Sequence, residues 1–562
     1  MRLRFLLLLA LAACSSFGDP PLTVENLCAG EGDCASGVCD PEGFCVTTEG
    51  VDLEIAVRVI PSAEDPNPTL SSWTSQVFVP NGEARDFTLP THVDVVGLLR
   101  WQESRVPAEV IFTRPGLEGR SEERVRVSTL SEPTRIGTME ADFVARLEAG
   151  QMYDVEVRPT AETMPGSDTP WRRTLPPIRL LQVTTPDTVD GRDVVWPVEI
   201  RFPPLDSDCG GGTFAGCGLL GQIVDADDRP EAGLQVRAVE VETGAVVSST
   251  ALTDEEGAFR ITTAPDAGEY VLRVSGGEGR ELFPTVSIDP ALLPGEARIR
   301  VPAPDAVTYR GRVEGEDGAP LAGATLSFAS ENVFDETVML RGSFGTSTTT
   351  DAEGEFEVDL LAGTYEIVVS PTAGQFSVLA EELRIVPSAT GAPISGQLFV
   401  APERARFGGT IRTAREELVP GVSVEAVALG VGGDDLPRAV TFNRSSDTAS
   451  DTGGQFLLRL DLGSYDLFVK PAAETNYGWV VLPGHEVGSL DATVVTPFEL
   501  AAPVPVRGTL RNDDGSFLVG AEVRVFGRST DSERFVELGR GRTDDQGQYR
   551  VLLSPRIASS VR

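Results

Sequence analysis

The reactive side chains of this sequence are few, and most of them are cysteines. Its 562 residues include 7 Cys and 2 His, and among its 47 basic residues Lys470 alone is a lysine. Cys14 ends an apolar run near the start of the chain, and the other cysteines form a close group and a distant pair. An even set of thiols at short spacing indicates disulfides formed in an oxidising compartment.

The close group predicts two disulfides, and its spacing leaves the pairing open; its members are Cys28, Cys34, Cys39 and Cys45. The distant pair, Cys209 and Cys217, brackets a Gly-rich loop and predicts a third disulfide. The alternative for the close group is a zinc site with four thiolate ligands, but the paired two-residue spacings of such sites are absent. So short a segment cannot build a hydrophobic core. We therefore expect a disulfide-stapled spacer between the membrane and the folded body.

The start of the chain has the features of an export signal. A positive segment, residues 1–4, precedes an apolar run, Phe5 to Ala13, that is much shorter than the ~20 residues needed to cross a bilayer as a helix. The end of this run, Leu-Ala-Ala-Cys14, resembles the lipobox of bacterial lipoproteins. The resemblance implies a diacylglycerol on the Cys14 sulfur, cleavage before it and acylation, for example by palmitate, of the new amino group. Because Ser15 rather than Asp follows, it also implies the outer membrane, with the protein facing the periplasm or the cell surface.

Composition points to β-structure and away from polyanionic partners. The chain has 58 Gly and 40 Pro, which indicates many turns, and its 41% hydrophobic content supports roughly three to five domains. The net charge of −38 argues against binding to nucleic acid or anionic lipid, which requires basic patches.

An internal repeat organises most of the chain. Each copy opens on a glycine, continues to a Thr/Ser-Asp-x-x-Gly-x-aromatic segment and then reaches Gly-x-Tyr. The opening glycines of four copies are Gly221, Gly311, Gly409 and Gly508, and a weaker copy without the Asp-x-x-Gly turn opens at Gly97. The last copy ends where Gly-x-Tyr is expected, so the chain is truncated there or the last unit borrows a strand from a partner. We therefore predict that isolated residues 504–562 are unstable or self-associate; a cooperative monomeric melt would contradict this.

The repeat follows the rules of β-sheets. The Asp side chain can accept hydrogen bonds from backbone N–H groups ahead of it, and Gly accepts positive φ. The aromatic residue, such as Phe356 or Phe456, then begins a strand whose alternate residues face inward. A tyrosine at the next corner, such as Tyr365 or Tyr465, can bury its ring while its hydroxyl bonds the preceding turn. We expect an all-β fold of seven-stranded sandwiches, each of about 95 residues, in a linear array that forms a rod.

The expected domain boundaries follow from this repeat. They are a signal peptide at 1–13, a linker at 14–27, a Cys-rich segment at 28–46, a degenerate N-terminal sandwich at 50–203, complete repeats at 204–302, 303–401 and 402–501, and an incomplete repeat at 502–562.

The repeat resembles the carboxypeptidase regulatory-like domain, which is similar in shape to transthyretin, to collagen-adhesin stalk domains and to starch-binding-like sandwiches. The resemblance covers residues 218–562 clearly and 93–200 weakly. The Cys-rich segment resembles small modules of large deltaproteobacterial (myxobacterial) envelope lipoproteins. The shared residues are turn and core residues, so they imply a fold and say little about function.

The residue types and their spacing predict that the chain is not an enzyme and holds no metal or cofactor. Neither His92 nor His485 has the glutamate three residues on that a metallocarboxypeptidase needs, and we expect both at the surface or in loops. No Gly-x-Ser-x-Gly elbow is present, and Lys470 is not preceded by the glycine of a P-loop. One lysine cannot supply isopeptide cross-links to five domains, and we expect none at Lys470.

Two binding roles remain open, each with a purely structural alternative. Acidic turns could bind calcium or could only cap the backbone; they hold Asp254, Glu255 and Glu256, or Asp544 and Asp545. Exposed aromatic rings could stack on sugars, or could fill cores and domain junctions; the tryptophans are Trp73, Trp101, Trp171, Trp196 and Trp479.

The sequence therefore predicts a non-catalytic, lipid-anchored envelope protein that acts as a structural stalk, an adhesin or an interaction scaffold. The alternative is a surface protein that binds polysaccharide. The expected partners are the membrane, through the lipid, and envelope proteins or polysaccharide, with no nucleic acid.

Overall fold

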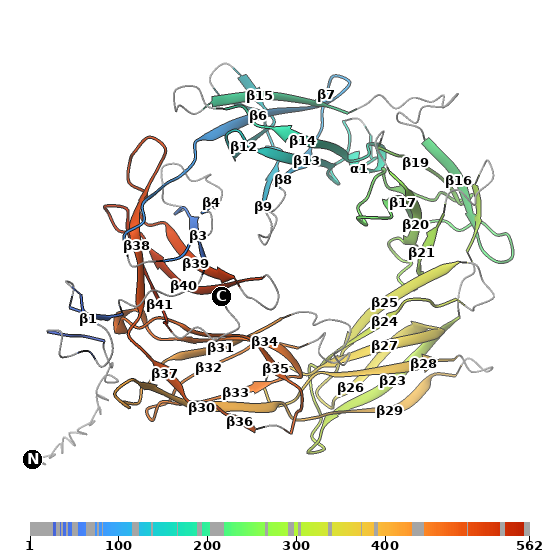
Figure 1. The fold of residues 1–562 in the computed structure, drawn as a ribbon. Helices are drawn as coiled ribbons and strands as arrows, with labels where there is room; N and C mark the ends of the chain where they lie inside the picture. The colour runs from blue at the N-terminus through green and yellow to red at the C-terminus, as the bar shows by residue number, and fades with distance from the viewer. Residues whose placement is uncertain are drawn as a thin grey trace, which may run out of the picture.

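The structure is a computed structural model, and it is nearly all β, which confirms the expected fold class of tandem sandwiches. It describes residues 26–29, 34, 38–40, 43–47, 54–62, 73–75, 78–80, 83–114, 123–136, 139–165, 167–187, 194–202, 218–264, 268–289, 297–301, 305–334, 340–372, 374–386, 392–429, 443–491, 493–528 and 534–555. Five sandwiches follow one another around a closed ring (Figure 1). Within the described residues, no helix has the length and apolar character needed to cross a membrane.

All five sandwiches share one plan of two packed sheets. The first strand of each lies at the centre of the smaller sheet, antiparallel to one neighbour and parallel to the last strand. The larger sheet has four strands, and in Figure 1 the larger sheets line the inside of the ring while the smaller sheets lie outside.

Sandwich I joins two sheets, β12-β6-β15 with β7, and β14-β13-β8-β9, and carries a small ribbon of β10 and β11. Its elements are β6 (His92–Trp101), β7 (Ser104–Arg105), β8 (Ala108–Arg114), β9 (Glu123–Ser128), β10 (Thr134–Ile136), β11 (Met139–Ala141), β12 (Phe143–Glu148), β13 (Met152–Pro159), α1 (Trp171–Thr174), β14 (Ile178–Thr184) and β15 (Val194–Arg201).

Sandwiches II and III share one continuous sheet of eight strands, in the order β18-β17-β20-β21-β25-β24-β27-β28. Sandwich II consists of β16 (Gly218–Val224), β17 (Leu234–Glu240), β18 (Ala251–Leu252), β19 (Ala258–Thr262), β20 (Tyr270–Gly276), β21 (Thr285–Ile288) and β22 (Ala297–Arg300). Sandwich III consists of β23 (Ala306–Gly315), β24 (Thr325–Ser330), β25 (Arg341–Thr349), β26 (Glu355–Leu361), β27 (Gly363–Ser370), β28 (Leu379–Ile385) and β29 (Ile394–Ala401).

Sandwich IV repeats the plan, with its last strand split in two. It consists of β30 (Ala405–Thr413), β31 (Ser423–Ala428), β32 (Ser446–Ala449), β33 (Gln455–Leu460), β34 (Gly463–Lys470), the 3-10 turn η4 (Ala473–Thr475), β35 (Val480–Val487), β36 (Thr493–Val495) and β37 (Phe498–Leu500).

Sandwich V is assembled from two distant parts of the chain. Its first four strands are β38 (Val504–Arg511), β39 (Glu522–Arg528), β40 (Phe535–Arg542) and β41 (Gln548–Leu553). Its last three are β3 (Ile55–Ile60), β4 (Trp73–Thr74) and β5 (Phe87–Thr88). They form the sheets β4-β3-β39-β40 and β41-β38-β5. The strands that the last repeat lacks are therefore supplied by residues 55–88 of the same chain.

This shared sandwich corrects two expectations. The linear array is replaced by a ring, because residues 55–88 lead directly into β6 of sandwich I while pairing with sandwich V. The expected unit at 50–203 is divided in the structure, with residues 55–88 in sandwich V and residues 92–201 in sandwich I. The physical reason is apolar burial, since Ile55, Val57 and Val59 complete the core that β39 and β40 leave uncovered.

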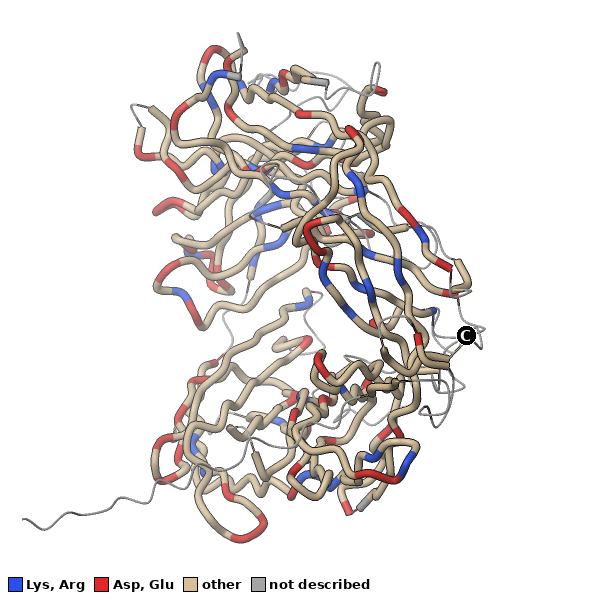
Figure 2. Tube along the Cα trace, turned by 90° about the vertical axis from the view of Figure 1, so that its left-hand side faces the viewer, with Lys and Arg blue, Asp and Glu red and all other residues tan. Residues whose placement is uncertain are grey.

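Charge follows the same division into strands and turns. In Figure 2 the acidic residues gather mainly at turns and loops along the edges of the molecule, whereas many basic residues lie within strands.

Candidate functional site

The candidate functional site is the place where the ring closes. β3 runs antiparallel to β39 from Ile55 opposite Gly527 to Ile60 opposite Glu522, and β5 runs parallel to the end of β38. The Arg85 backbone N–H donates to the Arg507 carbonyl oxygen at 2.7 Å. Closure is thus made by sheet hydrogen bonds as well as by the shared core.

Gly508 explains why each repeat opens on a glycine. A Cβ at Gly508 would lie 1.8 Å from the carbonyl oxygen of Arg85, so only glycine lets the closing segment approach. The same holds in sandwich IV, where a Cβ at Gly409 would lie 1.9 Å from the Thr496 carbonyl oxygen. In sandwiches III, IV and V the opening glycine therefore leaves space for the backbone of the last strand or of the segment that leads to it. The glycine at position 508 was a signal in the sequence that a strand also lies beside the last repeat.

Polar contacts fix the closing segment beside Gly508. The Tyr549 hydroxyl donates to the Arg85 carbonyl oxygen at 2.8 Å, and the Thr509 N–H donates to Asp86 Oδ1 at 2.7 Å. Burial, and next the charge of Asp86, raise the pKa of Tyr549. The hydroxyl therefore stays protonated and remains a donor at neutral pH.

The Cys-rich segment contains the two expected disulfides, which join Cys28 to Cys39 and Cys34 to Cys45. The small strands β1 (Val38–Cys39) and β2 (Cys45–Val46) pair between them. Three of these sulfurs lie close enough together to resemble a metal site, but all of them are bonded as disulfides. Cys14, Cys209 and Cys217 lie outside the described residues.

The segment is docked on sandwiches IV and V rather than extended as a free spacer. The Asn26 N–H donates to the Thr475 carbonyl oxygen at 2.9 Å, and the Asn26 side chain donates to the Cys45 carbonyl oxygen at 2.7 Å. Arg550 pairs with Asp40 at 3.2 Å and lies over the Phe44 ring at 5.1 Å from its centroid. The expected spacer is thus corrected to a segment bound beside the ring closure.

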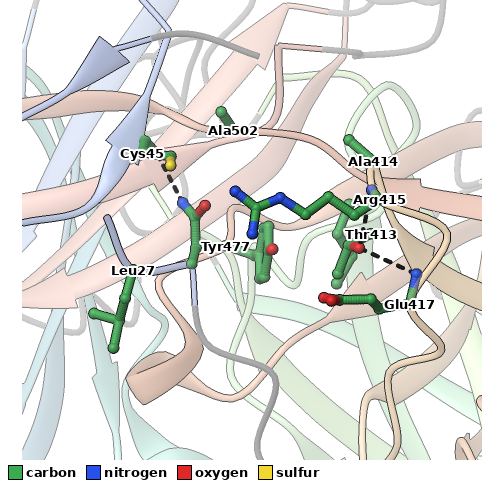
Figure 3. Close-up of a pocket in the computed structure, with 10 residues that line it drawn as sticks. Leu27, Cys45, Thr413, Ala414, Arg415, Glu417, Tyr477 and Ala502 are labelled. Carbon is green, nitrogen blue, oxygen red and sulfur yellow. Dashed lines mark hydrogen bonds between the residues drawn. The ribbon is translucent and has the colours of Figure 1, made fainter. Parts of the chain in front are cut away.

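A small cavity of about 40 Å³ lies beneath this docked segment (Figure 3). Leu27 and Cys45 line it on the docked side, and Thr413, Arg415 and Tyr477 line it on the side of sandwich IV. The Arg415 N–H donates to Thr413 Oγ1 at 3.1 Å, and burial raises the pKa of Tyr477. A space of this size holds one or two waters rather than an organic ligand.

The acidic turns have the predicted Asx geometry. In each of four repeats one carboxylate oxygen accepts two backbone N–H groups; Asp351 Oδ1, for example, accepts from Glu353 at 3.0 Å and from Glu355 at 2.8 Å. The equivalent turns are made by Asp254, Asp451 and Asp544. Because this oxygen already accepts two donors, turn capping accounts for the motif without calcium.

The corner tyrosines also bond the preceding turn, as predicted. The Tyr365 hydroxyl donates to the Leu361 carbonyl oxygen at 3.0 Å, and the Tyr465 hydroxyl donates to that of Asp461 at 3.1 Å. Burial raises the pKa of Tyr465 to about 12.

The two histidines lie in separate sandwiches, and neither is in a loop. His92 is buried at the start of β6, and His485 lies half-buried in β35, with its ring centroid 5.0 Å from that of Phe407. Burial lowers the pKa of His485. The expected surface or loop position was wrong, because both residues lie within strands and neither side chain is exposed.

The tryptophans with described side chains fill cores or junctions. Trp171 is buried in sandwich I, Trp101 meets it edge-to-face, and Trp196 packs on the same core. Trp479 of sandwich IV packs on the core of sandwich V. Trp73 begins β4, and its side chain lies outside the described residues. These positions favour the structural alternative over sugar stacking.

Lys470 also lies at the junction of sandwiches IV and V. Its ammonium pairs with Glu425 and lies 4.7 Å from the centroid of the Trp479 ring. Its partners are a carboxylate and aromatic rings, and the expectation of no isopeptide bond stays a prediction.

A buried charge cluster that the sequence did not indicate joins sandwiches III and IV. Asp461 is 1% exposed and accepts from Arg404 Nη2 at 3.1 Å, Arg444 Nε at 3.0 Å and the Ser377 hydroxyl at 3.0 Å. Burial alone would raise the pKa of Asp461, but the Arg444 hydrogen bond and the charges of Arg404 and Arg444 outweigh it and hold this pKa below its ordinary value. The carboxylate is therefore an ionised link between two sandwiches.

Comparison with known proteins supports the fold of one sandwich. Residues 308–392, within sandwich III, match the family model of the carboxypeptidase regulatory-like domain. No curated protein matches the chain. The match covers one repeat and describes that segment alone.

The solved structures that match this chain include two pilins and one further bacterial protein. A streptococcal ancillary pilin is 13% identical over 56% of this chain and 99% of that chain, with a TM-score of 0.21. The Bacillus anthracis TIE protein is 10% identical over 70% and 68%, with a TM-score of 0.17. BcpA, the major pilin subunit of Bacillus cereus, is 10% identical over 51% and 99%, with a TM-score of 0.14. Similarity this low carries no conclusion about function.

Proposed function

We propose that this protein is a non-catalytic scaffold of the bacterial envelope, anchored by a lipid on Cys14. The observation that supports the scaffold is the closure of the ring by residues 55–88. Closure joins residues 55–88 to both sandwich I and sandwich V, and the Cys-rich segment docks beside it on sandwiches IV and V. A closed ring offers several outer sheets to envelope proteins at once.

The placement of the described histidines and cysteines supports the non-catalytic part of the proposal. The two histidines lie in different sandwiches, and the described cysteines are disulfide-bonded. Among the described residues, the buried carboxylates Asp142, Asp461 and Asp466 each pair with arginine, which suits structural links.

Metabolic labelling with a radioactive fatty acid, followed by membrane fractionation, tests the anchor. We expect label in the wild-type protein and in a Ser16→Ala control, and none in Cys14→Ser. Protease shaving of intact cells then distinguishes the cell surface from the periplasm. Full labelling of Cys14→Ser would contradict the anchor.

We also infer a second function, binding of polysaccharide, because one face of the eight-stranded sheet carries uncompensated arginines beside hydroxyl groups. This function does not depend on the lipid anchor.

A further inference from the structure

A row of arginines crosses the sheet that joins sandwiches II and III. Arg237 of β17 lies opposite Arg273 of β20, Arg273 lies opposite Ser287 of β21, and Ser287 lies opposite Arg341 of β25. Directly opposite residues of antiparallel strands point to the same face. The alternate residues of these strands, such as Val236, Leu272 and Val286, fill the core. All four side chains of the row therefore stand on the other face, toward the inside of the ring (Figure 1).

The arginines of this row have no carboxylate partner among the described residues. The Nε atoms of Arg237 and Arg273 are buried and make no hydrogen bond, and Arg341 is exposed. Burial, and next the charge of Arg273, lower the pKa of the Arg237 guanidinium. Like charges directly opposite each other in a sheet are destabilising, and a buried donor without an acceptor costs about 1–3 kcal/mol. Both effects destabilise the fold, so the stability of the fold does not explain why arginine occupies these two positions.

In sandwich V the equivalent pair of arginines is balanced by nearby carboxylates. Arg58 of β3 lies opposite Arg524 of β39, as Arg273 lies opposite Arg237. There, however, Arg524 pairs with Glu522 at 2.6 Å and lies 3.9 Å from Glu537. Sandwich II has the same arginines without the acids, in a chain whose net charge is −38.

A second row beside the arginines carries hydroxyl and amide groups. Gln235 lies opposite Ser275, and Thr285 lies opposite Ser343. Strands lie about 4.8 Å apart, so the arginine row extends about 14 Å from Arg237 to Arg341. That length exceeds a single phosphate or sulfate and suits a chain with several anionic groups. The hydroxyl row can bond sugar hydroxyls beside it.

We propose that this face, defined by Arg237, Arg273, Arg341, Gln235, Ser275, Thr285, Ser287 and Ser343, binds an acidic polysaccharide that carries carboxylate, sulfate or phosphate groups. Guanidinium groups recognise such oxyanions by paired hydrogen bonds. The proposal rests on the second proposed function and names its substrate class. Nucleic acid fits less well, because these rows contain no aromatic side chain for base stacking and the whole chain repels a dense polyanion.

Titration calorimetry on the full chain in detergent tests the proposal, with polygalacturonate and dextran sulfate as acidic probes, and dextran and inorganic phosphate as controls. We expect saturable binding of at least one acidic polymer. Arg237→Gln and Arg273→Gln should each weaken it tenfold or more. Arg260→Gln is the matched control, because Arg260 lies exposed on the outer sheet of sandwich II, and it should change the affinity less than twofold.

The outcomes separate this proposal from the broader one. Binding of dextran as strong as that of the acidic polymers would overturn the acidic specificity and leave polysaccharide binding standing. No binding of any polymer would overturn both. Equal affinity for inorganic phosphate, or no effect of either variant, would overturn the extended arginine site. Thermal melting of both variants checks folding, and we expect no loss of stability, because each substitution removes a like-charge contact.

Discussion

At the scale of single residues, most of the structure depends on a few side chains that bond the backbone at fixed offsets. The Asp351 carboxylate holds its turn, and the corner hydroxyl of Tyr365 bonds the carbonyl four residues before it. Gly508 has a different role, since it leaves space for a strand that arrives from the other end of the sequence. Substitutions at these residues should therefore act locally, except at Gly508.

Gly508→Ala should disturb the closure of the ring. The new Cβ would lie 1.8 Å from the Arg85 carbonyl oxygen, and such overpacking costs about 1–3 kcal/mol or more. We expect faster amide hydrogen exchange in β3 and β5 and a lower melting temperature. Gly488→Ala is the control, because no atom lies within 4 Å of its new Cβ. Equal exchange in the two variants would argue against the close approach.

Alkaline pH should destabilise the protein through its corner tyrosines. An unfolded tyrosine ionises near pH 10, whereas burial raises the pKa of Tyr465 to about 12. The stabilisation by the neutral hydroxyl is fully present below about pH 10 and is lost as pH rises to about 12. Tyr465→Phe should lose about 1 kcal/mol at pH 7, because its hydrogen bond is gone, and should lose less than wild type between pH 10 and 12. Melting curves across this range measure both effects, and parallel curves would disprove the second.

At the scale of elements, neighbouring sandwiches are joined by three kinds of contact. Sandwiches II and III share a sheet through β21 and β25. Sandwiches III and IV are joined by the buried Asp461 cluster, and sandwiches IV and V by apolar packing of Phe468 and Trp479 on the core of V. Arg534 adds a two-point ion pair with Asp466 at 2.6 and 2.7 Å. Buried contacts of this kind fix the angle between neighbours.

Asp461→Asn should weaken the junction of sandwiches III and IV. Removing one partner of a buried ionic cluster costs about 3–5 kcal/mol. Because the folded pKa of Asp461 is depressed, its stabilisation is present above the unfolded pKa of about 3.9 and is lost as pH falls through the lower folded value. Thermal melting from pH 7 to pH 2 should show a smaller acid-dependent loss in Asp461→Asn than in wild type. Asp447→Asn, an exposed change in the same sandwich, should behave like wild type; an equal effect of both would refute a special role for Asp461.

At the scale of the whole molecule, closure turns a tandem repeat into a ring. Four sandwiches are each built from one stretch of chain, and the fifth joins two stretches more than 400 residues apart. The core of sandwich V would be exposed if residues 55–88 were absent, which gives a structural reason for the predicted instability of isolated residues 504–562.

A cysteine pair across the closure tests the ring directly. Arg58 and Arg524 lie opposite each other, so cysteines placed there would have Cα atoms about 4.5–5.5 Å apart, within the range of disulfides. We expect Arg58→Cys with Arg524→Cys to form an intrachain cross-link in dilute solution, seen as faster migration on a non-reducing gel. Arg58→Cys with Arg406→Cys, on the outer sheet of sandwich IV, should not cross-link. A rod would give cross-links between chains only, in amounts that rise with concentration.

The sequence by itself determined the repeated sandwich, its turns, its corner tyrosines and the presence of two disulfides within residues 28–45, while their pairing came from the structure. These features depend on residues close together in the chain, where spacing and side-chain type limit the geometry. It also located the defect of the last repeat, which lacks the segment that begins at Tyr365 or Tyr465 in other copies.

Only the tertiary structure decided which strands complete the last repeat and which side chains stand together on one face of a sheet. The alternation in residues 55–60 indicates a strand but does not indicate which strand pairs with it. The reason is that the hydrophobic effect is non-directional, so apolar side chains gain similar free energy against any core that fits them. In the same way, Arg237, Arg273 and Arg341 are far apart in the sequence, and only the register of β17, β20, β21 and β25 brings them into one row. Pairing between distant strands depends on which surfaces the rest of the fold leaves uncovered, and this decided both the ring and its proposed binding face.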